Sequence, residues 1–437
     1  MNQPIASLSL RDNLIYNLYY ALPLALQGAF TRSRFWVGFW TRWHHDAAAV
    51  RFVTGLRARY GRELLYLRLP TSRALLVLDR DGVRHVLDHS PTIYADGKLK
   101  REGMRVFQPN AVTISRGDDW RDRRRFNEAV LNSGCPLHQY AQSFLQVIAD
   151  EIAPATGPAR NFQTWDDFDR LFQRIALQVI YGRSARHDTT LTGLLRAMMR
   201  EAGRPFKPKK SKHFDRFYAR IGAYLYRAEA GSLVALCREV PSTERTRVEN
   251  QIPHWTFAAG ETLAINTVRA LALILAHPRA EARVRQEIAD ADLTRPESIE
   301  RLEYLEACLQ EAMRLWPTTP LLVRETVTED TLGGARIPAV TQVMIWNSFN
   351  HRDRAAYPLA DTFSPEAWAG GKPNPLFNHL SSGPQICAGI DLLLFIGKAV
   401  LALLLDRRQY ALLAPPLDPG RPIPYAYNHF DVRFTSQ

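Results

Sequence analysis

Apolar residues recur at three- and four-residue intervals over most of the chain, and this spacing predicts amphipathic helices. The segments with this pattern are 118–131, 140–152, 165–181, 189–202, 214–237, 280–291 and 298–316. Two short apolar runs, 64–69 and 74–79, predict a β-hairpin, and 341–346 predicts a further strand. The expected fold class is therefore mainly α with a minor antiparallel β part.

The longest helical pattern runs from about Thr243 to Ala276 and carries almost no charge after Trp255 except Glu261 and Arg269. A helix that is apolar on all sides has to lie in the middle of a large protein. A second apolar helix is expected at 388–405. We find no internal repeat and no long linker, so we expect residues 49–437 to form a single domain.

Residues 1–48 form a separate apolar and aromatic segment. The run Leu14–Phe30 is shorter than the roughly 20 residues of a membrane span and is interrupted by polar residues and Pro23. Basic and aromatic residues then interleave from Arg32 to Trp43, as at a membrane interface. Two interpretations stay open, peripheral membrane contact and an N-terminal helix that packs on its own domain.

Composition narrows the class of protein. The 437 residues are 46% hydrophobic and 23% charged, which is typical of a globular protein, and the net charge of +12 favours acidic partners. No basic-aromatic nucleic-acid module is recognisable, so we expect no nucleic-acid partner. The four cysteines form no C-x-x-C pair and no secretory signal is present, so we expect a reducing, cytoplasmic location.

One cysteine has an unusual setting. Cys387 follows a glycine-bearing loop and precedes an apolar helix, where free N–H groups stabilise a thiolate. Gly383 and Gly389 would let the backbone pass close to a flat ligand, which suits axial ligation of haem iron. A buried free cysteine and a catalytic thiol are the alternatives. Buried structural roles are expected for Cys135, Cys237 and Cys308.

Three further features carry candidate chemistry. Glu311 and Arg314 are spaced i, i+3 on a predicted helix, where they can pair, and the extended stretch that follows brings Arg324, a candidate partner for an anionic group. Glu261-Thr262 places an acid beside a hydroxyl within the buried helix, as proton delivery requires. The small residues before this pair would let a bulky ligand approach or the helical hydrogen bonding loosen.

The third feature is a pair of donors on the predicted helix 118–131. Trp120 and Arg124 are four residues apart and can point to the same side. Both side chains only donate hydrogen bonds, so a buried pair calls for an acceptor or an anion. The neighbouring Arg121, Arg123 and Arg125 are expected to form a solvated basic face that could also dock a partner.

With these residues the chain resembles a cytochrome P450 from about Leu64 to its C-terminus. Four family motifs occur in the family's order. They are W-x-x-x-R at Trp120 and Arg124, A-G-x-[D/E]-T at Ala258, Ala259, Gly260, Glu261 and Thr262, E-x-x-R at Glu311 and Arg314, and the haem-thiolate loop at Gly383, Cys387 and Gly389.

The chain also departs from the family pattern. Leu380 stands where the family usually has Phe, and Gln385 stands where an Arg or His usually binds a haem propionate. Trp120, Arg124 and Arg324 are then the expected anchors, with a neutral hydrogen bond from Ser381 or Gln385. Ala367 replaces the arginine that completes the E-R-R triad, and Arg352 and Arg354 are the candidate substitutes.

The resemblance implies a haem b enzyme that inserts one oxygen atom of O2 into a lipophilic small molecule by hydroxylation or epoxidation. It implies Cys387 as the iron ligand, Ala259 beside the haem, and Glu261 and Thr262 as the proton-delivery pair. The chain has no flavin or nicotinamide motif, so an external ferredoxin or flavodoxin with its NAD(P)H reductase is expected to supply electrons. The alternatives are a haem-thiolate peroxygenase or isomerase, and a non-catalytic haem-binding redox protein.

Overall fold

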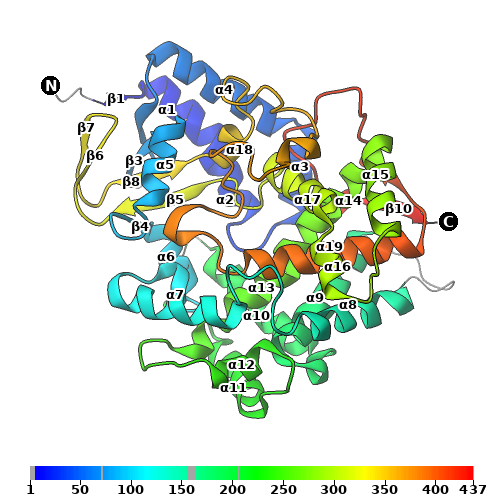
Figure 1. Ribbon diagram of the computed structural model, residues 1–437. Coiled ribbons are helices and arrows are strands. Elements are labelled where there is room, and N and C mark those ends of the chain that lie inside the picture. Colours follow the sequence, from blue (N-terminus) through cyan, green and yellow to red (C-terminus); the bar gives the residue numbers. More distant parts are fainter. Residues whose placement is uncertain (1–4, 70–71, 156–163, 205, 437) are drawn as a thin grey trace.

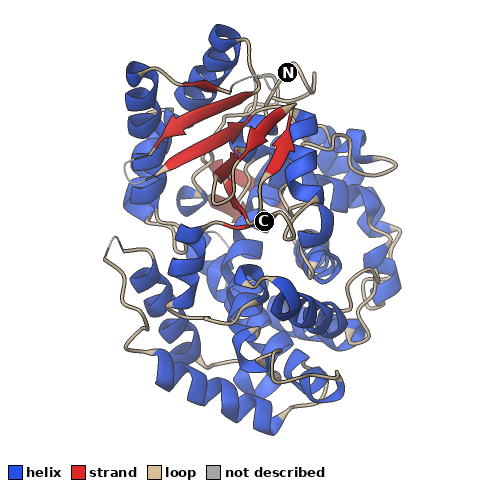
Figure 2. Ribbon diagram, turned by 90° about the vertical axis from the view of Figure 1, so that its left-hand side faces the viewer, coloured by secondary structure: helices blue, strands red, loops and turns tan. Residues whose placement is uncertain are grey.

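The computed structural model describes residues 5–69, 72–155, 164–204 and 206–436. The strands of the largest sheet gather at one end of the molecule, a small sheet lies at the opposite side beside the C-terminus, and helices fill the remainder (Figures 1 and 2). The mainly α class predicted from the periodicity is confirmed.

Helices make up most of the chain between its two ends. In chain order they are α1 (Leu10–Tyr16), α2 (Leu22–Gln27), α3 (Arg34–Arg42), α4 (His45–Tyr60), α5 (Arg80–Asp88), α6 (Lys98–Arg105), α7 (Gly117–Leu131), α8 (Ala141–Ala155), α9 (Trp165–Tyr181), α10 (Thr189–Ala202), α11 (Phe214–Arg227), α12 (Leu233–Glu239), α13 (Ile252–Phe257), α14 (Leu263–Ala276), α15 (Pro278–Ala289), α16 (Pro296–Glu300), α17 (Glu303–Leu315), α18 (Asn347–Asn350) and α19 (Ile390–Arg407). Short 3₁₀ and π segments are η1 (Asn17–Ala21), η2 (Val112–Ile114), η3 (Arg183–Ala185), η4 (Val248–Asn250), η5 (Ala258–Thr262), η6 (Pro365–Trp368), η7 (Gly383–Gln385) and η8 (His429–Asp431).

The largest sheet has the strand order β1-β2-β3-β8-β5-β4. The predicted hairpin is its β2–β3 pair, and two of its pairings, β1–β2 and β3–β8, are parallel rather than antiparallel. Two-stranded sheets join β6 to β7 and β9 to β10. The strands are β1 (Ala6–Ser7), β2 (Leu64–Arg68), β3 (Arg73–Val77), β4 (Tyr94–Asp96), β5 (Leu322–Thr326), β6 (Asp330–Leu332), β7 (Ala335–Ile337), β8 (Gln342–Ile345), β9 (Tyr410–Ala414) and β10 (Arg433–Ser436).

Two predicted helices are each split in two. The segment 214–237 forms α11 and α12, separated by a turn in which Ala228 and Gly231 have φ angles of 46° and 77°. The segment 298–316 overlaps α16 and α17, which are separated by Arg301 and Leu302. The apolar spacing continues across both turns, so periodicity alone could not locate them.

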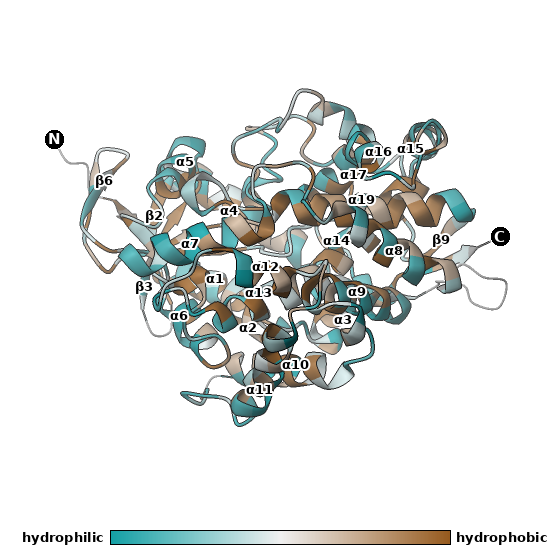
Figure 3. Cartoon of the chain, turned by 60° about the horizontal axis from the view of Figure 1, so that its bottom comes forward, coloured by the Kyte–Doolittle hydropathy of each residue, from teal (hydrophilic) through white to brown (hydrophobic). Residues whose placement is uncertain are grey.

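The predicted buried helix is confirmed, although it begins at Val248 and changes its winding midway. The apolar window within 248–276 is long enough to cross a membrane, but 72% of it is buried inside the protein, as in a core helix. Its middle, η5, is a π-turn, consistent with the loosening expected of its small residues. Figure 3 shows the apolar colour of α14 and α19 in the interior and polar colour on α5 and α7.

The N-terminal segment packs on the rest of the protein. Strand β1 pairs with β2, and Asn13 accepts a hydrogen bond from the backbone N–H of Arg68 at 2.6 Å. Tyr16 and Tyr20 are buried and lie against Trp346 with ring centroids 6.3 and 3.6 Å away. The opposite face of the segment stays exposed at Leu10, Leu14, Leu18, Phe35 and Trp43.

Candidate active site

The loop before α19 holds Cys387 in a tight backbone turn. The Cys387 N–H donates to the Leu380 carbonyl at 2.9 Å, and the Ile386 N–H donates to the Gly383 carbonyl at 3.0 Å. Gly383 has a φ of 64°, and a Cβ there would overlap the Leu87 carbonyl at the end of α5. Only glycine fits this position, because the conformation is left-handed and the neighbouring backbone is fixed.

The C-terminal half of α7 fixes this loop from outside. Arg124 donates to the Ile386 carbonyl at 2.6 Å and to Glu128 at 2.6 Å, and Ser133 donates to the Ala388 carbonyl. Burial raises the pKa of the Cys387 thiol, while the Gly389 N–H and Arg124 lower it in part. The positive charge of Arg124 therefore favours the thiolate form of Cys387.

Trp120 and Arg124 share α7 as predicted, and both are half-buried. Arg123, expected on a solvated face, is instead 6% exposed and donates to the Arg245 carbonyl at 2.9 Å and to Ser115 at 2.6 Å. It ties α7 to two loops and is not available for docking. Of the cysteines expected to be buried, Cys237 and Cys308 are, whereas Cys135 is exposed.

Glu261 and Thr262 lie in the π-turn, half-buried. Helix α14 continues from this turn and packs against α19, which begins three residues after Cys387. Burial raises the pKa of the Glu261 carboxyl, and Arg196 partly offsets the effect. Arg196 is itself paired with Asp169 at 2.5 Å. This acid therefore holds its proton to a higher pH than an exposed glutamate.

Glu311 and Arg314 form a fully buried ion pair, with both side chains 0% exposed and nitrogen–oxygen distances of 2.7 Å. Arg314 also donates to three backbone carbonyls, two of them at 2.8 Å. Glu311 accepts two more hydrogen bonds, from the Trp368 indole at 2.9 Å and from the Ser364 N–H at 3.0 Å. The carboxylate is therefore satisfied without a third charged partner.

The two arginines considered as substitutes for that partner do not contact Glu311. Arg352 is buried and pairs with Asp361 at 2.9 Å, and the exposed Arg354 pairs with the same carboxylate at 2.5 Å. The Trp368 indole and the Ser364 N–H donate to Glu311 in place of the missing arginine. The expectation that Arg352 or Arg354 replaces the arginine missing at Ala367 is wrong.

Arg324 belongs to a buried charged cluster at the end of β4 and β5. It pairs with Asp96 at 3.3 Å, and Lys100 pairs with the same carboxylate at 2.6 Å. Arg101 and Arg116 both pair with Glu325, at 3.0 and 2.8 Å. Burial opposes the charge on Glu325, yet the hydrogen bonds from Arg116 and Arg101 prevail and hold its pKa below its usual range.

This cluster has more positive than negative charge, because four cations meet two carboxylates. The Nε atoms of Arg116 and Arg324 are buried and have no protein partner. The sequence predicted Arg324 but missed Arg101 and Arg116. A signal was present at one of them, since Arg116 lies four residues before Trp120, one helical turn from the recognised motif.

The residues fit a haem b group on two counts. The surplus of two positive charges and the two unpartnered Nε atoms match the two propionates that haem b carries. The side chains of Ser381 and Gln385 also have buried oxygen atoms without a protein partner in the cysteine loop. In the part of the chain that the structure describes, no three His, Cys, Asp or Glu side chains gather in a way that could hold a metal ion.

Comparisons with known proteins agree with this geometry. The cytochrome P450 family profile matches residues 237–423. Cyclooctat-9-en-7-ol 5-monooxygenase of Streptomyces melanosporofaciens is 26% identical over 71% of this chain and 73% of its own length. Cytochrome P450 714C2 of rice, Oryza sativa subsp. japonica, is 30% identical, over 39% of this chain and 36% of that protein.

Among solved structures, the retinoic acid-bound cyanobacterial CYP120A1 superposes with a TM-score of 0.72. The two are 18% identical, and the match covers 88% of this chain and 94% of that one. The fold, the buried Glu311–Arg314 pair, the cysteine loop and the family profile lead to one conclusion. The chain belongs to the cytochrome P450 family of haem b monooxygenases.

Proposed function

We propose that the protein inserts one oxygen atom of O2 into a lipophilic small molecule, by hydroxylation or epoxidation. The observation that carries this proposal is the pairing of a preformed cysteine loop with a π-turn that presents an acid and a hydroxyl. The Streptomyces relative and the cyanobacterial neighbour support the substrate class, because one is named for oxygenation of a cyclic alkenol and the other was solved with retinoic acid. Both are lipophilic molecules.

We propose that Cys387 would bind the iron of haem b through its thiolate, and this group would supply O2 activation to the site. Ala259, 9% exposed, leaves room for the flat macrocycle beside the helix. Arg324 and Arg116 would hold the propionates through their free Nε atoms, and Trp120 and Arg124 flank the group from α7. Gln385 and Ser381 would donate or accept neutral hydrogen bonds at the cysteine loop. The backbone N–H of Gly389 donates a hydrogen bond to the Cys387 sulfur.

Glu261 and Thr262 act as a proton-delivery pair in this proposal. The raised pKa of Glu261 lets the carboxyl keep its proton to a higher pH than an exposed glutamate, and the charge of Arg196 partly offsets this effect. The Thr262 hydroxyl can hold a water molecule in hydrogen-bond reach. Glu311 and Arg314 have a structural role, since their buried pair fixes α17 to the loops that precede the cysteine.

Electrons would come from an acidic ferredoxin or flavodoxin with its NAD(P)H reductase. Arg121 and Arg125 remain as the exposed cations of α7, on the helix that fixes the cysteine loop. The net charge of +12 favours such an encounter. Replacing both arginines with glutamate should slow reduction at low salt, and an unchanged rate would exclude this docking site.

We place the protein in the cytoplasm with peripheral membrane contact through the exposed side chains of residues 10–43. Leu10, Phe35 and Trp43 are 80%, 68% and 70% exposed, and an apolar surface of this kind suits a membrane interface. Co-sedimentation with anionic vesicles should be lost in a Phe35→Ser/Trp43→Ser variant. Equal sedimentation of the variant and the wild type would exclude this contact.

The experiment that tests the activity is turnover with generic redox partners. Substrate-dependent NAD(P)H oxidation with an oxygenated product is expected. Product formation from peroxide alone, without any response to NAD(P)H and redox partners, would favour a peroxygenase instead. Haem binding without turnover of any lipophilic compound would favour a redox protein.

A further inference from the structure

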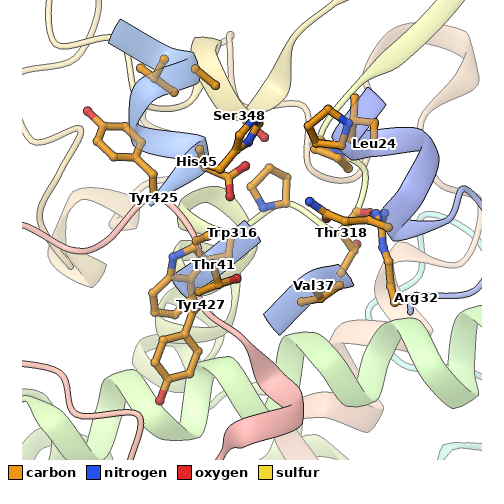
Figure 4. A pocket seen from close by; sticks show the side chains of 18 of the residues that line it. Leu24, Arg32, Val37, Thr41, His45, Trp316, Thr318, Ser348, Tyr425 and Tyr427 are labelled. Carbon is orange, nitrogen blue, oxygen red and sulfur yellow. The ribbon is translucent and has the colours of Figure 1, made fainter. Parts of the chain in front are cut away.

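A cavity of about 110 Å³ lies between the N-terminal segment and helix α14, which continues from the Glu261-Thr262 turn. Its walls come from the N-terminal segment, α14, the loop after α17, the segment after β8 and the C-terminal loop, which converge in Figure 4. Ile265 and Arg269 line it from α14, about one and two turns beyond Glu261-Thr262. We call it the N-terminal cavity.

Two arginines and one aspartate line this cavity. Arg32 donates to the carbonyls of Gly28 and Thr318 at 2.9 and 3.0 Å, and Arg269 donates to those of Trp316 and Tyr427 at 2.8 and 3.1 Å. Both guanidinium groups thus bond neutral carbonyls.

Asp46 faces the same space. Within the described ranges, no ion pair shorter than 4.0 Å joins Asp46 to Arg32 or Arg269. The three charges together leave a surplus of one positive charge. A monoanion would neutralise this surplus.

Hydrogen-bond donors on the cavity wall lack partners. The Tyr20 hydroxyl, the Trp346 Nε1 and the Arg269 Nε are buried without a protein partner, and Tyr20 and Trp346 are 3% and 4% exposed. The Trp and Arg groups can only donate, and a buried donor without an acceptor costs about 1–3 kcal/mol. Two histidines also line the cavity, and His45 Nε2 and both ring nitrogens of His429 are buried without a protein partner. A neutral imidazole ring brings one donor and one acceptor, whereas the Trp346 and Arg269 groups only donate, so the missing partner should be an acceptor.

The charges in the cavity are poorly solvated. Burial raises the pKa of Asp46 to about 6 and, with the repulsion of Arg32, lowers the pKa of Arg269 to about 9. Burial also lowers the pKa of Arg32. All three side chains are partly exposed, so water reaches them, but the surrounding protein weakens their hydration.

We propose that the N-terminal cavity binds a carboxylate group, held by Arg32 and Arg269 with hydrogen bonds from Tyr20 and Trp346. A carboxylate brings two acceptor oxygens and one negative charge, and a guanidinium can bind it with charge-assisted hydrogen bonds. The volume exceeds the roughly 30 Å³ share of one water molecule but is below the roughly 300 Å³ or more of a whole-ligand pocket. It is the size of a head group.

The carboxylate can have two sources, the head group of a lipophilic acid that extends from the oxygenation site, or a separate short acid. Arg32 links the two regions, because its charge acts on both Asp46 and Glu261. The first source rests on the proposed function, whereas the second stands without it. The chain length of the probe distinguishes them.

Titration calorimetry of the haem-loaded, full-length protein at constant ionic strength tests the site. The probes are hexadecanoate, methyl hexadecanoate and hexanoate. Either carboxylate is expected to bind, and the affinity should fall about tenfold or more in Arg269→Gln, where a charge-assisted hydrogen bond is lost. Asp46→Asn should bind more tightly, because it removes the repelling carboxylate. Arg42→Gln, at an exposed arginine of the same segment, is the control and should bind as the wild type does.

Opposite effects of Arg269→Gln and Asp46→Asn could not arise from general unfolding. A longer acid that binds at least tenfold more tightly than both its methyl ester and hexanoate indicates a substrate head group, whereas equal binding of the two acids indicates a separate short acid. No carboxylate binding, or binding insensitive to both cavity variants, would overturn the proposal. Methyl ester turnover without any preference for the acid would overturn the cavity site and leave the oxygenase function intact.

Discussion

The buried carboxylate of Glu311 gives the sharpest test of the structural account. Trp368→Phe removes the indole N–H that donates to Glu311 at 2.9 Å while keeping an aromatic ring. A hydrogen bond to a charged group contributes about 1.5–3 kcal/mol, and the smaller ring adds about 1 kcal/mol of lost packing. We therefore expect a loss of about 2.5–4 kcal/mol in the free energy of unfolding.

Trp346→Phe is the matched control. Trp346 is also buried, at 4% exposed, but its Nε1 has no protein partner, so only the packing part of the cost should appear. Arg354→Ala is the second control, because its side chain is 69% exposed and its ion pair with Asp361 should contribute about 1 kcal/mol or less.

Urea unfolding of the haem-loaded variants, followed by far-ultraviolet circular dichroism, measures these differences. The expected order of destabilisation is Trp368→Phe, then Trp346→Phe, then Arg354→Ala. If Trp368→Phe cost no more than Trp346→Phe, the indole would not support Glu311. If Arg354→Ala cost more than either, the arginine would have the role that we assign to Trp368.

Three further outcomes are expected. Asp46→Asn should stabilise the protein by up to about 3 kcal/mol at pH 8, since each unit of the rise from 3.8 to about 6 is worth about 1.4 kcal/mol. The folded state binds the Asp46 proton more tightly than the unfolded state does, so the gain in stability should shrink as the pH falls from 6 towards 4. A gain that is constant with pH would contradict the raised pKa of Asp46. Gly103→Ala should destabilise, because its Cβ would lie 2.5 and 2.7 Å from ring atoms of Phe30, whereas in a Phe30→Ala background it should stabilise by about 1 kcal/mol through helix propensity; the same sign in both backgrounds would refute the contact. Thr262→Ala should consume NAD(P)H with less product and more hydrogen peroxide, and equal coupling in mutant and wild type would remove Thr262 from proton delivery.

The spacing of apolar residues predicted helix bounds correctly where the ends of a helix are marked by nearby residues. Helices α9 and α10 have the predicted bounds, Trp165–Tyr181 and Thr189–Ala202, because their apolar stripes end at glycines or polar turns. The break between α11 and α12 was missed. It depends on a left-handed turn at Ala228 and on a close approach in which a Cβ at Gly231 would lie 2.9 Å from the Ser143 hydroxyl. Neither leaves a trace in hydrophobic spacing.

The candidate site divides in the same way. Cys387, Glu261, Thr262 and the Glu311–Arg314 pair lie in compact motifs, so their spacing was informative. The support for Glu311 comes from Trp368, 57 residues along the chain, and its identity follows only from tertiary packing.

The pattern of charged residues gave a wrong prediction at Arg123 and gave no prediction for the residues of the N-terminal cavity. Arg123 stands in a run of charged residues, but it is buried, and one of its partners is the carbonyl of Arg245, 122 residues away in the sequence. The N-terminal cavity combines residues from five distant segments, and none of the lining residues belongs to a recognised motif. Its unpartnered donors become visible only when the chain is folded.

The central claim is that Cys387 presents a thiolate to haem b. The reduced, carbon monoxide-bound difference spectrum of the purified protein tests it most directly, with Cys387→Ser as the comparison and Cys135→Ser, at the exposed cysteine, as the control. We predict a thiolate-shifted Soret band in the wild type and in Cys135→Ser that is lost in Cys387→Ser. A histidine-like band, an absent band, or a thiolate band that survives in Cys387→Ser would contradict the account.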